Sequence, residues 1–129
     1  TEVEDAVRFY ELTGVTSLAI AIGTAHGMQK KNAKINFQRL EEIHSRLPEV
    51  PLVLHGSSGV PKEDIKKAIK LGIKKVNIAT ELKMAMASGI KKALDNGTIE
   101  PRDYLTEGIE SVKKEVLNNI DILGSAGRV

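Results

Sequence analysis

The sequence contains no cysteine and no tryptophan, and only 3% of its 129 residues are aromatic. Without cysteine the chain can form neither a disulfide framework, nor a thiolate metal site, nor a cysteine nucleophile. So few aromatic side chains also argue against a surface on which nucleic-acid bases would stack. Any metal ion bound by this chain is therefore expected to be held by imidazole.

The sequence also lacks a large excess of charge of one sign and has no long apolar run. The formal net charge is +2, which is too small for an electrostatic nucleic-acid binder. The longest apolar run, residues 18–22, is far shorter than the ~20 residues that cross a membrane. The acidic residues 1–9 lack the apolar region of a signal peptide. These features predict a soluble, cytoplasmic α/β protein that binds neither nucleic acid nor membrane.

Short apolar segments alternate with segments of helical periodicity. We expect a strand covered on both faces at residues 17–22, a second buried strand at residues 51–54 and a third short strand at residues 75–78. Helices are expected from a capping box of Thr1 and Glu4 to Gly14, from an N-cap at Asn36 to Leu47, from Pro61 to Gly72, from Thr80 to about Leu94, and over residues 105–120. Such alternation predicts right-handed βαβ units and a parallel sheet. Three units form either a small open sheet or a piece of an eight-stranded barrel, which typically needs about 250 residues.

Polar side chains accompany the end of each expected strand, where parallel α/β proteins place their functional groups. The first strand leads to His26, the second leads to His55, and the third contains Asn77. Imidazoles from neighbouring strand ends can converge on one Zn²⁺, although two histidines alone do not complete a zinc site. The alternative is that each histidine hydrogen-bonds the main chain at a tight turn. His44 lies within a helix and is expected to pack or to face solvent rather than bind metal.

A loop of small residues, Gly56 to Gly59, joins the second strand to the next helix. Small residues let main-chain N–H groups approach an anion, and the helix dipole adds to the attraction. Thr80, at another expected helix start, offers a hydroxyl and an N–H to the same anion. The pattern predicts a phosphate site, although loops of this composition also occur as simple turns.

Three ordered motifs are residues 19–27 (AIAIGTAHG), residues 51–61 (PLVLHGSSGVP) and residues 75–83 (KVNIATELK). Together they resemble class II, zinc-dependent ketose-bisphosphate aldolases, most closely the tagatose-bisphosphate branch, and GSAGR at residues 124–128 resembles the tail of that branch. The resemblance covers nearly the whole chain. It implies that residues 1–129 are the C-terminal portion of one (β/α)8 TIM-barrel domain, three βα units plus a terminal helix, with the N-terminal portion absent.

The resemblance further implies reversible cleavage of a ketose 1,6-bisphosphate to dihydroxyacetone phosphate and glyceraldehyde 3-phosphate. Zinc would polarise the substrate carbonyl and stabilise the enediolate left by cleavage. His26 and His55 match two of the three zinc-binding histidines. The dihydroxyacetone-phosphate contacts match Gly27, Gly56, Ser57, Ser58, Asn77, Ile78, Ala79 and Thr80. The third zinc histidine and the acid/base aspartate of the family lie on an earlier strand, so no catalytic residue is assigned to this chain.

One position at which the sequence departs from the family, and the open edges of the expected sheet, lead to two further expectations. Ala79 stands where fructose-bisphosphate enzymes of this family usually carry Asn or Asp, which favours tagatose 1,6-bisphosphate as the substrate. The open edges of a three-stranded sheet favour association with the missing N-terminal portion or with another copy, so a homo-oligomer is expected. The alternative function is a non-catalytic phosphate-binding α/β module, folded alone or swapped with a second copy.

Overall fold

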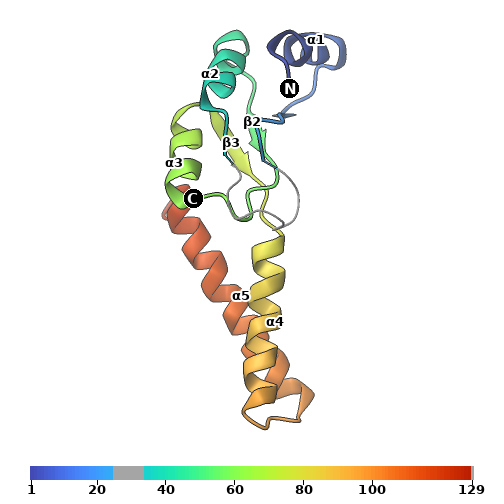
Figure 1. The fold of residues 1–129 in the computed structure, drawn as a ribbon, viewed down its shortest axis with the longest axis vertical. Coiled ribbons are helices and arrows are strands. Elements are labelled where there is room, and N and C mark those ends of the chain that lie inside the picture. Colours follow the sequence, from blue (N-terminus) through green and yellow to red (C-terminus); the bar gives the residue numbers. More distant parts are fainter. Residues whose placement is uncertain (25–33, 129) are drawn as a thin grey trace. The chain divides into compact units, whose positions relative to one another are not determined.

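A computed structural model describes residues 1–24 and 34–128 of the chain (Figure 1). Within these residues, helices and strands alternate until the last two helices follow each other directly. In chain order the elements are α1 (Val3–Thr13), β1 (Leu18–Ala19), α2 (Phe37–Arg46), β2 (Leu52–Leu54), α3 (Lys62–Lys70), β3 (Ile73–Val76), α4 (Thr80–Asp95) and α5 (Pro101–Leu123). The chain divides into two compact units, Thr1–Ile78 and Ala79–Val129.

The strands of the first unit form one sheet in the order β1-β2-β3, and both pairs are parallel. In the register, Leu18 lies opposite Leu52, and Leu54 lies opposite Val76. The predicted α/β fold with a parallel sheet is therefore confirmed. Because parallel strands run in the same direction, their carboxyl ends lie along one edge of the sheet. We call the residues Thr24, His55, Ser57 and Asn77, which follow the three strands, the rim.

The third strand begins two residues earlier than predicted, since β3 spans Ile73–Val76 rather than residues 75–78. Ile73 is almost completely buried and pairs with Leu52, so the strand starts directly after Gly72. A φ of 123° at Gly72, which glycine adopts at no steric cost, lets the chain turn there from α3 into β3. Asn77, predicted to lie within the strand, instead follows its end.

Burial alternates along β1 and its continuation. Leu18, Ile20 and Ile22 are buried, whereas Ala19 and Ala21 are exposed. The expectation that this segment is covered on both faces is therefore wrong in the structure, because one face is open and lined by small side chains. The core on the covered side combines residues of the strands with residues of α2 and α3. Its most deeply buried apolar members are Leu40, Ile43, Leu52, Leu54, Ala68 and Ile73.

The starts of the first two helices test the predicted caps. The side-chain oxygen of Asn36 accepts a hydrogen bond from the N–H of Arg39 at 2.9 Å, so the predicted cap of α2 is confirmed. The predicted capping box at Thr1 is wrong, because Glu2 occupies the cap position of α1 and makes no side-chain cap bond. The Thr1 hydroxyl oxygen instead accepts from the N–H of Ala21 at 2.8 Å, a bond to the edge of the sheet that competes with local capping.

Ion pairs join α1 to α2. Arg39 Nη1 lies 2.9 Å from Glu2 Oε1, and Arg46 Nη1 lies 2.7 Å from Glu4 Oε1. The hydrogen bond from Arg39 holds the pKa of Glu2 below its ordinary value. Both carboxylates are exposed, so these pairs orient α1 against α2 and contribute little to the free energy of unfolding.

The second unit is a hairpin of two helices, α4 and α5 (Figure 1). Gly89 of α4 and Gly108 of α5 are both buried where the helices approach each other. A Cβ atom at Gly89 would lie 2.5 Å from the carbonyl oxygen of Glu107 and 2.9 Å from the Cα of Gly108, and it would also collide with the Ser111 hydroxyl. The close approach of the two backbones therefore requires a residue without a side chain at this position.

Substituting Gly89→Ala should lower the free energy of unfolding of the hairpin, measured by urea denaturation followed by circular dichroism. Overpacking typically costs about 1–3 kcal/mol, whereas replacing glycine by alanine inside a helix returns about 0.5–1 kcal/mol, so a net loss is expected. Ser88→Ala, at an exposed neighbour in the same helix, is the control and should not destabilise. A Gly89→Ala variant as stable as this control would contradict the close crossing.

Candidate functional site

Three chain segments meet at the rim. Thr24 follows β1, His55 directly follows β2, and Asn77 directly follows β3. The ladder continues past the strands here, because the N–H of Asn77 donates to the carbonyl oxygen of Leu54 at 3.0 Å. The structure thus places His55 and Asn77, both predicted site residues, next to each other. His26 and Gly27 lie outside the described residues, so their predicted roles stay predictions.

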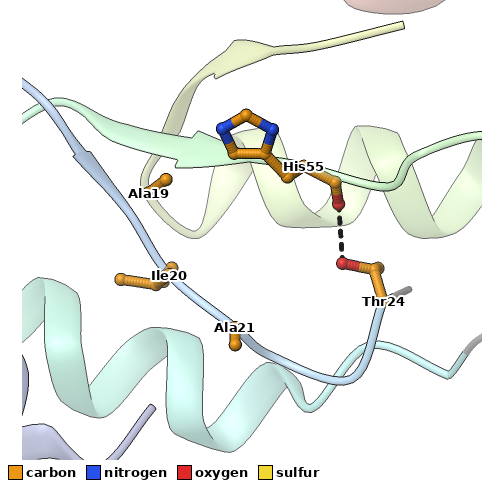
Figure 2. A pocket seen from close by; sticks show the side chains of 5 residues that line it. All are labelled: Ala19, Ile20, Ala21, Thr24 and His55. Carbon is orange, nitrogen blue, oxygen red and sulfur yellow. Dashed lines mark hydrogen bonds between the residues drawn. The ribbon is translucent and has the colours of Figure 1, made fainter. Parts of the chain in front are cut away.

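His55 is half-buried and is held through its main chain. The Thr24 hydroxyl donates a hydrogen bond to the carbonyl oxygen of His55 at 2.7 Å (Figure 2). The imidazole extends from the other side of the His55 main chain, so Thr24 contacts the backbone and not the ring (Figure 2). A cavity of about 340 Å³ opens beside these groups, lined by Ala19, Ile20, Ala21, Thr24 and His55.

The side-chain amide of Asn77 lies against the ring of His55. Its Nδ2 atom is 3.3 Å from Nδ1 and also 3.3 Å from Nε2 of the imidazole. These ring nitrogens lie on opposite sides of Cε1, so an atom equally close to both cannot sit in the ring plane without colliding with ring atoms. The amide therefore covers one face of the imidazole, and this contact restricts how the ring can rotate.

The loop after His55 packs tightly into the unit. Ser57 is only 2% exposed, and Ser58 is also buried. The Ser57 hydroxyl donates to the carbonyl oxygen of Asn77 at 2.8 Å, and the carbonyl of Ser57 accepts from the N–H of Val60 at 3.0 Å. Positive φ angles of 63° at Gly56 and 87° at Gly59 allow the loop to turn toward α3. The Ser57 side chain thus links two rim segments, and its contact with a phosphate stays a prediction.

The remaining predicted substrate contacts, residues 78–80, are consecutive in the sequence. Ile78 is the last residue of the first unit, and Ala79 is the first residue of the second. Thr80 begins α4, as predicted, and Ala79 occupies the position before it with a φ of −137°. At the start of α4, the main-chain N–H groups have no partners within the helix itself, and such groups attract anions.

His44 packs as predicted. Its ring lies against Gly72, where an added Cβ would come within 2.6 Å of the ring carbon Cγ. His44 is half-buried, and its Nδ1 atom is buried without a hydrogen-bond partner among the described residues. Contact with the α3–β3 turn accounts for this histidine, so it is not grouped with His55.

Metal-binding side chains do not cluster in the described part of the chain. Among residues 1–24 and 34–128, no group of three or more His, Asp or Glu side chains is arranged to hold an ion. Zinc sites of enzymes commonly use three protein ligands. Among the described residues, His55 is the one predicted zinc ligand, its role stays a prediction, and no complete ligand set is formed. No helix in these ranges is both long and apolar enough to span a membrane.

Parallel α/β enzymes place their active sites at the carboxyl ends of the strands, and this edge of the present sheet carries an imidazole, an amide and a small-residue loop. The chain belongs to the class II fructose-bisphosphate aldolase family, since the model of that family, Fructose-bisphosphate aldolase class-II, matches residues 1–128.

Solved structures show the same relationship. The chain is 38% identical to the YdjI aldolase from Escherichia coli K12, with a TM-score of 0.87 over 99% of this chain and 46% of that one. It is 25% identical to a fructose-bisphosphate aldolase from Campylobacter jejuni, with a TM-score of 0.79 over 96% of this chain and 45% of that one. The chain therefore spans about half the length of these aldolases.

The sequence patterns do not single out one rim residue. Thr24 belongs to the motif at residues 19–27, but the resemblance implies roles only for the histidine and the glycine after it. Its contact with His55 joins positions 31 residues apart. A hydroxyl residue next to a glycine at a strand end was the available signal, but the sequence does not specify which carbonyl the hydroxyl reaches.

Ser57→Ala should lower the free energy of unfolding by about 1–2 kcal/mol, because it removes a buried hydrogen bond and takes the hydroxyl donor from the carbonyl oxygen of Asn77. Ser45→Ala is the matched control, since the exposed Ser45 hydroxyl donates to the carbonyl of Glu42 at 2.8 Å within its own helix. Urea denaturation of both variants measures the difference. Equal losses would mean that the link from Ser57 to Asn77 contributes nothing particular to the rim.

Proposed function

We propose that this chain forms part of a class II aldolase that reversibly cleaves a ketose 1,6-bisphosphate to dihydroxyacetone phosphate and glyceraldehyde 3-phosphate. The observation that carries the proposal is that His55 and Asn77 meet at the rim, with Asn77 Nδ2 3.3 Å from His55 Nδ1. The chain that forms this rim belongs to the class II aldolase family. A metal ligand and a polar substrate contact so placed can act on one bound molecule. The names of the solved relatives, both aldolases, support this reaction class.

We propose Zn²⁺ as the metal, with His26 and His55 as two ligands. The imidazole of His55 suits zinc, and the Asn77 amide against the ring face orients it. A third ligand and the acid/base aspartate would come from a portion of the protein outside this chain. When bound, zinc supplies a Lewis acid for the substrate carbonyl. This chain's own part is to hold His55 in place and to bind the substrate.

Substrate binding is assigned to small and polar residues of the rim and of the two helix starts. Main-chain N–H groups of the loop before α3 and of the start of α4 suit phosphate oxygens, because both lie where a helix dipole is positive. The residues proposed to contact dihydroxyacetone phosphate are Gly27, Gly56, Ser57, Ser58, Asn77, Ile78, Ala79 and Thr80. For Ser57 the contact would be made by the N–H, since its hydroxyl already donates to Asn77.

We propose that residues 1–129 are the C-terminal portion of one barrel domain whose N-terminal portion is absent from this chain. Within the described residues, the outer edge of β1 pairs with no other strand, and Ala19 and Ala21 are exposed beside it. An apolar groove of about 500 Å³ runs along this edge, lined by Thr1, Asp5, Ala6, Phe9, Ser17, Leu18 and Ala19. A preceding βα segment would cover these groups, as barrel closure requires.

We also propose a cytoplasmic homo-oligomer. Several large apolar side chains of α5 are exposed, among them Leu105, Ile109 and Leu117, at 42%, 57% and 56%. Contact with another copy would remove this surface from water, which is a favourable change of free energy.

The chain alone is expected to bind zinc weakly and to show no aldolase activity, because a two-histidine site lacks its third ligand and the aspartate. Zinc titration by calorimetry and a coupled assay with fructose and tagatose 1,6-bisphosphate measure this. His55→Ala should abolish the weak zinc binding, whereas His44→Asn should leave it unchanged. Robust turnover by the 129-residue chain would refute the proposed division of the site.

For the completed enzyme, joined to its N-terminal portion, tagatose 1,6-bisphosphate should be preferred because Ala79 replaces the Asn or Asp of the fructose enzymes. Comparison of kcat/KM for the two sugars measures the preference, and Ala79→Asn should reduce it. A strong preference for fructose 1,6-bisphosphate would refute it. Phosphate binding without any cleavage by the completed protein would favour a non-catalytic phosphate-binding module.

A further inference from the structure

We propose that Thr24 is a positioning residue for His55. Its hydroxyl fixes the main chain from which the imidazole extends, through the carbonyl oxygen and not through the ring. The observations are the 2.7 Å hydrogen bond from Thr24 Oγ1 to the His55 carbonyl and the direction of the imidazole away from Thr24 (Figure 2). The inference rests on the proposed function, in which His55 holds the metal ion.

A side-chain link is needed here because the backbone pairing of β1 with β2 is short. β1 spans only Leu18–Ala19, and the main-chain bond that follows, from Ile20 N to the carbonyl of Val53, is long at 3.4 Å. His55 lies two residues beyond Val53. The Thr24 hydroxyl therefore extends the attachment between the two segments from the end of the ladder to the residue that carries the imidazole.

The opposite side of His55 is attached in a comparable way. Asn77 covers one face of the imidazole, and the main-chain carbonyl of Asn77 accepts a hydrogen bond from the buried Ser57 hydroxyl at 2.8 Å. His55 is thus held at its main chain by the segment after β1 and at its ring by the segment after β3. Loss of either attachment leaves the ring with more freedom. Outer contacts of this kind tune metal ligands by fixing their orientation.

The chemistry of threonine allows a clean separation of shape from hydrogen bonding. Thr24→Val keeps the branched shape beside the cavity and removes the donor, so it isolates the hydrogen bond. Thr24→Ser restores the donor with less bulk. Thr13→Val is the matched control, because the exposed Thr13 hydroxyl also donates to a main-chain carbonyl, that of Phe9 at 2.7 Å, but within α1.

The experiment records the side-chain NMR signals of His55 and Asn77, together with those of the core methyl groups, in the full 129-residue chain, first without metal and then during titration with Zn²⁺. Thr24→Val should shift the His55 and Asn77 signals and weaken zinc binding about tenfold, the lower range for loss of such a contact. Thr24→Ser should restore both readouts, and Thr13→Val should change neither. A melting temperature for each variant shows whether the fold is retained.

Three results would overturn the proposal. One is a Thr24→Val variant whose His55 and Asn77 signals stay at their positions in the parent chain and whose zinc affinity stays within about twofold of it, below the expected effect. Another is a set of shifts spread evenly over the core methyl groups, which indicates a purely structural role. The third is failure of Thr24→Ser to rescue. If Thr24→Val does not fold, Thr24→Ala is measured by the same criteria.

The outcome is separable from that of the proposed function. Localised shifts of His55 and Asn77 in a parent chain that binds no zinc would support the positioning role of Thr24 and contradict the metal assignment. Zinc binding that is unaffected by Thr24→Val would support the metal assignment and contradict the positioning role.

Discussion

The parallel pairing of β2 with both of its neighbours is the constraint on which the rest of the first unit depends. It brings three strand ends to one edge of the sheet, and this alone makes Thr24, His55 and Asn77 neighbours. Strands of two, three and four residues supply few ladder hydrogen bonds. Side-chain hydroxyls continue the attachment beyond them, so the same bonds that stabilise the edge of the sheet also set the geometry of the candidate site.

Much of the fold was predictable because its signals are local. The alternation of apolar segments with helical periodicity predicted the parallel α/β arrangement, and Asn36 before an amphipathic segment predicted the cap of α2. The errors occurred where a distant contact competes with a local preference. Thr1 bonds to Ala21 instead of capping α1, and β3 begins at Ile73 because that side chain packs against the paired strand.

The candidate site, like the fold, was predictable where the signal is local and was not predictable where a distant contact decides the arrangement. Its position directly after a short apolar strand predicts that His55 lies at the edge of the sheet, and it does so in the structure. Ser57 is predicted to contact phosphate, which stays a prediction; the sequence does not indicate that this residue, only 2% exposed, donates its hydroxyl to the carbonyl of Asn77, the partner that its burial requires. The sequence does not indicate the role of Thr24, since the carbonyl that its hydroxyl reaches belongs to another βα unit.

The sequence by itself determined the order of the elements, the family and the identity of the chemical groups, because periodicity, caps and motifs are properties of neighbouring residues. Only the tertiary structure decided which groups meet. In the structure the Asn77 amide lies on the face of the His55 ring, and the hydroxyls of Thr24 and Ser57 join strand ends. One face of β1 is exposed. The physical reason is that these contacts depend on strand register and chain direction in space, and no local pattern encodes either with atomic accuracy.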